Sequence, residues 1–234
     1  MASWKDITEV LPYGYALVYA LKVEGIPYLF IEKAVTDLSV AGYTADASLQ
    51  ITDSARIGSV IDEETGIGRA FDLTVGIERT TATESIFKKP SNICRLDADL
   101  AYDGTTMTVD STTGFAASGY LYLGVERMSY SGLSGTSFTG LTRGLPAADW
   151  RGYGYDVTSS ISTWVTDQPL FWRGRRAKLY AMPIDPTGRA TAGNFTTDAV
   201  EVWTGHIATD PRPYPNGWTL SCRSLDRRLD VEIG

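Results

Sequence analysis

Few side chains in this sequence could do acid–base or nucleophilic chemistry. His206 is the only histidine, and it lies between Gly205 and Ile207 in a segment with the pattern of a strand. A Ser–His–Asp or Cys–His device would have to use its imidazole. Residues 131–135 place serines beside glycines, but their spacing does not match a nucleophile elbow and no helical pattern follows. We therefore expect a structural or surface role for His206 and no enzymatic activity; a cell-wall hydrolase would depend on this residue.

The two cysteines, Cys94 and Cys222, are the other residues with reactive side chains. They lie far apart in the chain, and with one histidine they cannot form a tetrahedral zinc site without several carboxylates. A disulfide framework needs more cysteines in a smaller chain. We expect two free, buried thiols, which is how cysteines without a partner usually pack.

Acidic residues cluster at turn-like places without the pattern of a metal site. Residues 185–189 begin like a calcium loop, but the acidic residues at alternate positions and the closing glutamate are missing. The carboxylates at 62–64, and those of Asp97, Asp99 and Asp103, are interpreted as solvated turn residues. The glycines at 66–69 precede a strand, whereas a phosphate cradle needs a glycine turn that opens a helix. The sequence thus predicts no metal and no cofactor.

Two clusters are candidates for binding. The strongest basic cluster comprises Trp172, Arg173, Arg175 and Arg176. It is either an ion-pairing interface for an acidic partner subunit or the polar entry of a strand. The second cluster is aromatic and consists of Tyr120, Tyr122, Tyr130, Trp150, Tyr153 and Tyr155. If exposed, these rings could stack on sugars or act as interface hot spots; if buried, they would form the core of a small β unit, which we favour.

Charge excludes some classes of partner. The formal net charge is −7, from 21 basic and 28 acidic residues. Phosphate affinity depends on clustered Lys and Arg, so we expect no nucleic-acid recognition. No run of 18 apolar residues could form a membrane span, and the first 11 residues lack the pattern of a signal peptide. The net charges of 1–94, 95–160 and 161–234 are −5, −3 and +1, which is compatible with head-to-tail contact between neighbouring subunits.

Strand patterns dominate the chain. Residues 15–23 and 28–31 flank a tight turn at 25–27 and predict a hairpin. Alternation is clearest at 70–77, and further strands are expected at 47–51, 176–182, 200–207 and 218–222. Short helices are expected only at 4–10 and 224–231. No βαβ alternation occurs, so we predict an all-β fold with an antiparallel sandwich or barrel core.

The composition changes near residue 95. No lysine occurs between Lys89 and Lys178, and residues 95–160 are dense in Gly, Ser and Thr. Short apolar stretches alternate there with turn signals such as Asp103-Gly104, which is typical of a small β module. We therefore expect a β core formed by residues 1–95 and 158–234, and an inserted small β module at 96–157.

The inserted segment resembles a small β module that recurs in structural proteins of tailed phages. The resemblance rests on residues 107–115, 119–124, 128–132 and 137–144. The flanking segments more loosely resemble distal-tail or tail-hub proteins of the tail tip, in residues 25–30, 66–73, 202–207 and 218–224. Hub proteins of that family are usually longer, so the length fits a distal-tail or adaptor component or a reduced hub.

The resemblance implies a role in assembly. It implies a trimeric or hexameric ring that joins the tail tube to the host-recognition apparatus and binds other tail proteins, with no catalytic residues. The protein would then be made in the bacterial host cytoplasm and reside in the virion tail. The alternative is a carbohydrate- or receptor-binding module of the virion, for which the tyrosines of the inserted module and Trp150 would have to be exposed in a row.

Overall fold

The computed structural model describes residues 16–35, 38–51, 72–145, 159–184, 187 and 199–224. It is mostly β, as predicted, and its described part contains a single helix and three sheets. No helix in the described ranges is long and apolar enough to cross a membrane. The helix predicted at 4–10 lies outside the described residues, as does all but the first residue of that predicted at 224–231.

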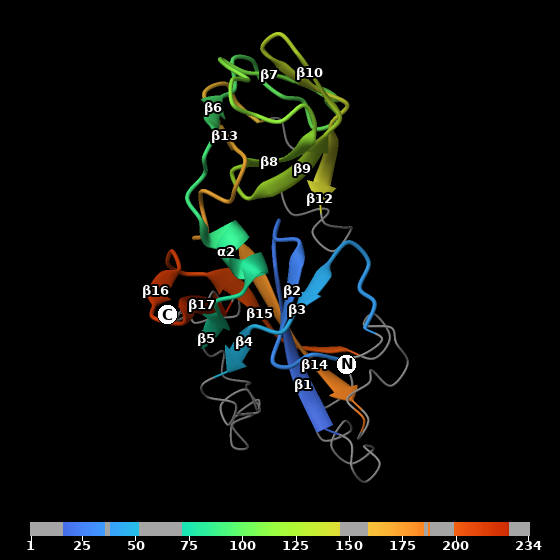
Figure 1. Ribbon diagram of the computed structural model, residues 1–234, viewed down its shortest axis with the longest axis vertical. Helices are drawn as coiled ribbons and strands as arrows, with labels where there is room; N and C mark the ends of the chain where they lie inside the picture. Colours follow the sequence, from blue (N-terminus) through green and yellow to red (C-terminus); the bar gives the residue numbers. More distant parts are fainter. Residues whose placement is uncertain are drawn as a thin grey trace, which may run out of the picture.

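The main sheet is built from both ends of the described chain (Figure 1). Its strands are β1 (Ala16–Val23), β2 (Tyr28–Ile31), β3 (Thr44–Asp46), β4 (Leu49–Ile51), β5 (Leu73–Glu78), β14 (Arg176–Ile184), β15 (Val200–Ile207), β16 (Arg212–Tyr214) and β17 (Gly217–Ser224). Their order is β3-β2-β1-β14-β15-β17-β5-β4, with β16 paired to β17. The predicted hairpin is present, because β1 and β2 pair antiparallel.

The main sheet curls until its two edges are neighbours in sequence. Edge strands β3 and β4 are separated only by Ala47 and Ser48. The pairing of β2 with β3 is parallel, whereas the other pairings of this sheet are antiparallel. This curled half-barrel shortens the exposed edges that an open sheet would present.

Alternating side chains explain the burial of the main sheet. In β5, Leu73, Val75 and Ile77 are buried while Thr74 is exposed, as expected for a strand with one face toward the core. The enclosed core also contains Phe30, Trp203 and Cys222. β1 is buried on both faces, because its other side packs into a second cluster with Val18, Ala20, Leu29, Ile31, Met182 and Ile184.

The segment from β6 to β13 forms the small module at one end of the molecule (Figure 1). Its strands are β6 (Ile93–Arg95), β7 (Thr106–Thr108), β8 (Gly119–Leu123), β9 (Glu126–Tyr130), β10 (Gly132–Ser134), β11 (Ser137–Thr139), β12 (Thr142–Leu145) and β13 (Trp164–Thr166). They form a five-stranded sheet, β12-β9-β8-β13-β6, and a three-stranded sheet, β10-β11-β7. β6 and β13 lie outside the expected bounds of 96–157, yet they pair with each other, and β13 also pairs with β8.

The small module has a core of its own, with Leu121, Met128, Phe138 and Val165 fully buried. Phe138 packs edge-on against Phe115 and Tyr130, with ring centroids 5.1 and 4.9 Å away. Inside the sheet, Arg143 and Glu126 form a largely buried ion pair with 2.6 Å between Nη2 and Oε2. These contacts are internal to the module, so its fold does not depend on the main sheet for a core.

Candidate functional site

The chain crosses between the main sheet and the small module at two neighbouring segments, 88–92 and 167–175. Asp167 fastens them together, because its carboxylate accepts hydrogen bonds from the backbone N–H of Ser91 and from Asn92. The side-chain amide of Asn92 adds a third bond, at 2.8 Å to Oδ2 of Asp167. Hydrogen bonds from Asp167 therefore hold the two crossing segments side by side.

Arg175 connects the two parts of the protein from inside. Its side chain is fully buried, and Nη1 donates to the carbonyl oxygens of Glu24 at 2.8 Å and Val125 at 2.7 Å. Nε donates to the carbonyl of Phe171 at 2.6 Å, and Nη2 donates to that of Gly124 at 3.2 Å. A buried guanidinium is tolerable only when acceptors surround it, as they do here.

Gly25 allows the backbones of the two parts to approach each other. Its φ is +71°, and a Cβ at this position would lie 2.3 Å from the carbonyl oxygen of Val125 and 2.6 Å from Nη1 of Arg175. Only glycine satisfies both the backbone conformation and the space. The turn after β1 therefore closes directly onto the turn between β8 and β9.

The basic cluster expected to form an interface is divided by the structure. Arg175 holds the protein together internally, which corrects its assignment to a surface for a partner subunit. Trp172 is also buried, with 5 % of its surface exposed. Arg176 is partly buried at the start of β14, and its backbone N–H donates to Glu24. Of the four side chains, only that of Arg173 is exposed.

Three aromatic rings stack beside the junction. Phe87 lies between two indoles, with centroids 4.3 Å from Trp172 and 4.5 Å from Trp218, at interplanar angles of 12° and 14°. Trp218 comes from β17, Phe87 ends helix α2 (Thr81–Phe87), and Trp172 precedes β14. The guanidinium of Arg79 lies over Trp218, 5.4 Å from the centroid. This stack joins three segments that are distant in sequence.

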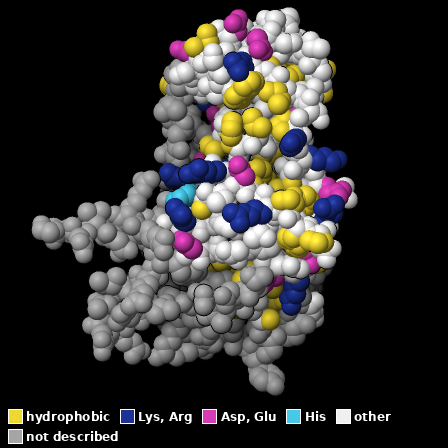
Figure 2. Space-filling view, turned by 90° about the vertical axis from the view of Figure 1, so that its left-hand side faces the viewer, with side chains coloured by type: hydrophobic (Ala, Val, Ile, Leu, Met, Phe, Trp, Pro, Cys, Tyr) yellow, Lys and Arg dark blue, Asp and Glu magenta, His cyan; other side chains and the backbone are white. Residues whose placement is uncertain are grey.

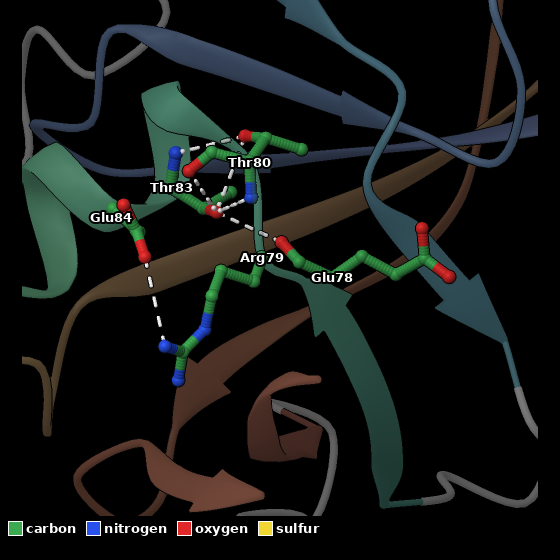
Figure 3. A network of polar contacts seen from close by, with 5 residues as sticks. All are labelled: Glu78, Arg79, Thr80, Thr83 and Glu84. Carbon is green, nitrogen blue, oxygen red and sulfur yellow. Dashed lines mark hydrogen bonds and ion pairs between the residues drawn. The ribbon is translucent and has the colours of Figure 1, made fainter. Parts of the chain in front are cut away.

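Helix α2 places Phe87 in this stack, and its start is fixed by a capping box (Figure 3). The Thr80 hydroxyl accepts from the backbone N–H of Thr83 at 3.1 Å, and Oγ1 of Thr83 accepts from the N–H of Thr80 at 2.7 Å. Thr80 also donates to the carboxylate of Asp46 in β3. Arg79 forms an exposed ion pair with Glu84 at 3.6 Å. The residues of α2 were not predicted as helical.

The aromatic stack forms one wall of a groove, which we call the junction groove. It has a volume of about 580 Å³. Its lining is Phe87, Lys88, Lys89, Pro90, Ile93, Pro169, Leu170, Trp172, Asp210, Pro211, Pro213 and Trp218. Figure 2 shows this side of the molecule: hydrophobic side chains run down the middle from the small module to the main sheet, and Lys and Arg side chains flank them. The groove is apolar and aromatic, with two lysines in its lining.

Exposed apolar side chains extend the groove onto the small module. Ile93 is 49 % exposed and Trp164 37 %. Both lie on the outer face of the β6–β13 pair, because Trp164 pairs with Arg95 while Cys94 and Val165 point into the module core. The guanidinium of Arg95 covers Trp164, 3.9 Å from the ring centroid. Phe171, 44 % exposed, adds to the apolar surface of the neighbouring crossing segment.

Among the candidate tyrosines that the structure describes, Tyr120, Tyr122 and Tyr130, only Tyr120 is exposed, so these three form no exposed row. Tyr122 and Tyr130 are buried, with burial as the main cause that raises the pKa of each phenol. Tyr130 donates to the carbonyl of Ala116 at 2.7 Å. Tyr120 is 52 % exposed, and Arg127 stacks on its ring at 3.6 Å from the centroid. The other candidates, Trp150 and Tyr153, lie outside the described residues, as does Tyr155.

The residues considered for chemistry are dispersed. His206 lies partly exposed in β15, where it pairs with Arg176 of β14. Cys94 and Cys222 are free and buried, as predicted, and burial raises the pKa of each thiol to about 12, with a smaller contribution from Asp110 or Asp72. Within the described part of the chain, no three His, Cys, Asp or Glu side chains are placed to hold a metal ion.

Of the residues that line the junction groove, only Trp172 was predicted from the sequence as part of a binding site. A signal was nevertheless present, because an aromatic residue is followed by two lysines and a proline at 87–90, and Pro211 and Pro213 precede Trp218. What was missing was proximity: β17 and α2 come together only through the pairing of β17 with β5.

Comparison with known proteins adds no relative, since no family model, no curated protein and no solved structure matches the chain. The junction groove combines stacked rings, prolines and exposed cations, which suits binding of a polypeptide surface that carries apolar and acidic side chains.

Proposed function

We propose that the protein is a structural, non-catalytic subunit of a phage tail tip or baseplate. In this role it forms a ring, trimeric or hexameric, that joins the tail tube to the host-recognition apparatus. The observation that carries the proposal is the junction groove with its exposed extension through Ile93, Trp164 and Phe171. Contiguous apolar surface flanked by charges is typical of protein–protein contact sites.

The hydrogen bonds that join the small module to the main sheet support a structural role. Arg175 hydrogen-bonds to both parts of the chain, and Asp167 fastens the two crossing segments. A module attached in this way keeps its orientation relative to the main sheet, which a subunit needs if it is to place neighbouring proteins in register. The resemblance of residues 107–144 to a phage β module supports the same proposal.

The alternative, carbohydrate binding, is less well supported. Sugar rings bind on exposed aromatic faces, yet both faces of Phe87 are covered by Trp172 and Trp218. Arg95 covers Trp164, and Arg127 covers Tyr120. These three rings are thus engaged within the protein, so the structural role is the better proposal.

The test is the location of the protein in a virus particle. Antibodies raised against the purified protein would be applied, with gold labels, to tailed particles from lysed cells that produce it. Label at the end of the tail distal to the capsid is the expected result, with antibody against an unrelated protein as the control. Particles that lack the protein by mass spectrometry, or that carry label on the capsid, would overturn the proposal.

A further inference from the structure

The small module carries an acidic loop whose chemistry complements the junction groove. We propose that the groove of one copy binds residues 97–103 of a neighbouring copy, head to tail. This inference rests on the proposed function, since it names the contact through which the ring would close.

The groove supplies cations. Lys88 and Lys89 in its lining are exposed, and neither forms an ion pair with any residue that the structure describes. Arg173, also exposed, follows the lining residue Trp172. The acidic lining residue Asp210 already accepts a hydrogen bond from the backbone N–H of Arg173 at 3.4 Å. The groove surface is therefore basic on a chain whose net charge is −7.

The acidic loop supplies anions. Asp97, Asp99 and Asp103 are exposed, and the sequence contains no Lys or Arg between Arg95 and Arg127. The guanidinium of Arg143 donates to the carbonyl of Ala101 in this loop, but Arg143 forms its ion pair with Glu126, and no ion pair joins the three carboxylates to a described residue. Their field should attract a basic surface and raise the rate of encounter with it.

The acidic loop and the segment hydrogen-bonded to it each present one exposed apolar side chain. Tyr102 is 57 % exposed and Ile161 is 55 % exposed. The loop is held against the segment before β13, because Leu100 and Ser159 exchange two backbone hydrogen bonds of 2.9 and 2.8 Å. Asp99 accepts a further bond from the N–H of Ile161 at 2.7 Å. A pre-organised loop loses little conformational entropy on binding.

The junction groove and the acidic loop are complementary in apolar surface and in charge. An exposed tyrosine with an aliphatic neighbour suits a groove of about 580 Å³ lined by aromatic rings and prolines. The flanking aspartates would meet Lys88 and Lys89 at the rim, where charge sets the orientation and the choice of partner. A second copy is the occupant we favour because the complementary surface is present on this same chain.

The surfaces are different from each other, so the contact is heterologous. Each subunit would use its groove toward one neighbour and its acidic loop toward the next. Such contacts close into a ring when the rotation between subunits divides a full turn. This is the geometry that a tail ring requires.

Charge reversal tests the proposal with the full-length protein. The association constant would be measured by light scattering across a concentration series for the parent, for K88E/K89E and for D97K/D103K. Each double variant should associate at least about tenfold more weakly, because like charges would then face each other. The control is K33E/R223E, which reverses two exposed cations outside the groove lining and should leave association unchanged.

Complementation separates a direct contact from a general effect of charge. In the fourfold variant K88E/K89E/D97K/D103K, both surfaces are reversed and association should return. An equimolar mixture of the two double variants should recover association as well, since the groove of one variant then meets a loop of opposite charge on the other. Because the two variants must alternate, the mixture closes a hexameric ring but not a trimeric one. Thermal unfolding of every variant checks that it is folded.

Several results would overturn the proposal. These are a parent that stays monomeric up to its solubility limit, double variants that associate like the parent, or a fourfold variant that stays dissociated. If the double variants lose their place in tail particles while the purified parent is a strict monomer, the groove binds another tail protein instead. The proposed tail-tip role would survive that outcome, because it is tested separately by the location of the protein in the particle.

Discussion

The guanidinium of Arg175 and the carbonyl oxygen of Val125 are 2.7 Å apart, and this hydrogen bond joins the main sheet to the small module. The same Nη1 atom also donates to the carbonyl of Glu24. Arg175 thus satisfies backbone acceptors from both parts at once, and its own side chain is fully buried.

We expect R175M to destabilise the protein strongly. Methionine fills much of the space but leaves the carbonyls of Glu24, Gly124, Val125 and Phe171 without their donor. The bond to Glu24 is buried and the other three are partly buried, and a buried group left unsatisfied costs about 1–3 kcal/mol. A loss of at least about 3 kcal/mol should appear in the free energy of unfolding measured with urea. The matched control is R173M on the exposed neighbour, which should change stability by less than about 0.5 kcal/mol. Equal effects of the two substitutions would contradict this role for Arg175.

The second prediction concerns Gly25. G25A forces a Cβ to within 2.3 Å of the Val125 carbonyl oxygen and requires a residue with a side chain at φ +71°. Together these should cost about 2–4 kcal/mol. Gly124 provides the control, because its φ is +62° but nothing lies within 4 Å of the added Cβ. G124A should cost only the backbone term, about 1–2 kcal/mol; a G25A variant no less stable than G124A would show that the close approach is not required.

Strand positions were predictable from sequence because apolar residues at every second position indicate a strand with one face buried. Residues 70–77 were predicted as a strand from their apolar period, and β5 occupies Leu73–Glu78 with the expected face buried. Helix α2 was missed because a seven-residue helix that begins with threonines lacks both the length and the propensity for a clear signal. Its capping box depends on a threonine in place of the usual glutamate or glutamine.

The role of Arg175 could not be read from sequence for a different reason. A basic residue beside other basic residues predicts a surface, and the partners that bury Arg175 are backbone carbonyls. Every residue has a backbone carbonyl, so the residue types at 24, 124 and 125 do not indicate that these positions accept hydrogen bonds from Arg175. The same holds for the junction groove, whose walls meet only after the main sheet has curled.

The third prediction concerns the cysteines. With the pKa of each thiol raised to about 12, only about one thiol in ten thousand is ionised at pH 8. A disulfide reagent should therefore leave Cys94 and Cys222 unmodified in the folded protein and label both in concentrated urea. Rapid labelling of either residue without denaturant would show that its surroundings open readily.

The raised thiol pKa values also fix the sign of a pH effect. The unfolded thiols ionise near pH 8.5, well below the folded ones. Between about pH 8.5 and 12 the unfolded chain can lose the thiol protons while the folded protein keeps them, so rising pH favours unfolding. The free energy of unfolding is therefore unaffected by ionisation of the thiols below about pH 8.5 and falls as the pH rises toward 12. C94A and C222A should each flatten the decline of unfolding free energy across this range, relative to the parent.

The last prediction concerns the stack that forms the wall of the groove. F87L keeps an apolar side chain between Trp172 and Trp218 but removes both ring-stacking contacts, so we expect a loss of about 1–3 kcal/mol from two aromatic pairs. F87A also removes the remaining apolar contacts and should cost more than F87L, but less than the about 3–5 kcal/mol of a fully buried Phe→Ala substitution, because Phe87 is only partly buried. Near-UV circular dichroism should report the change directly, because the stacked indoles lose their fixed neighbour. F115L, which removes a single edge-on contact inside the small module, is the control. It should leave the groove intact, so a loss of self-association in F87L but not in F115L would link the aromatic wall to binding.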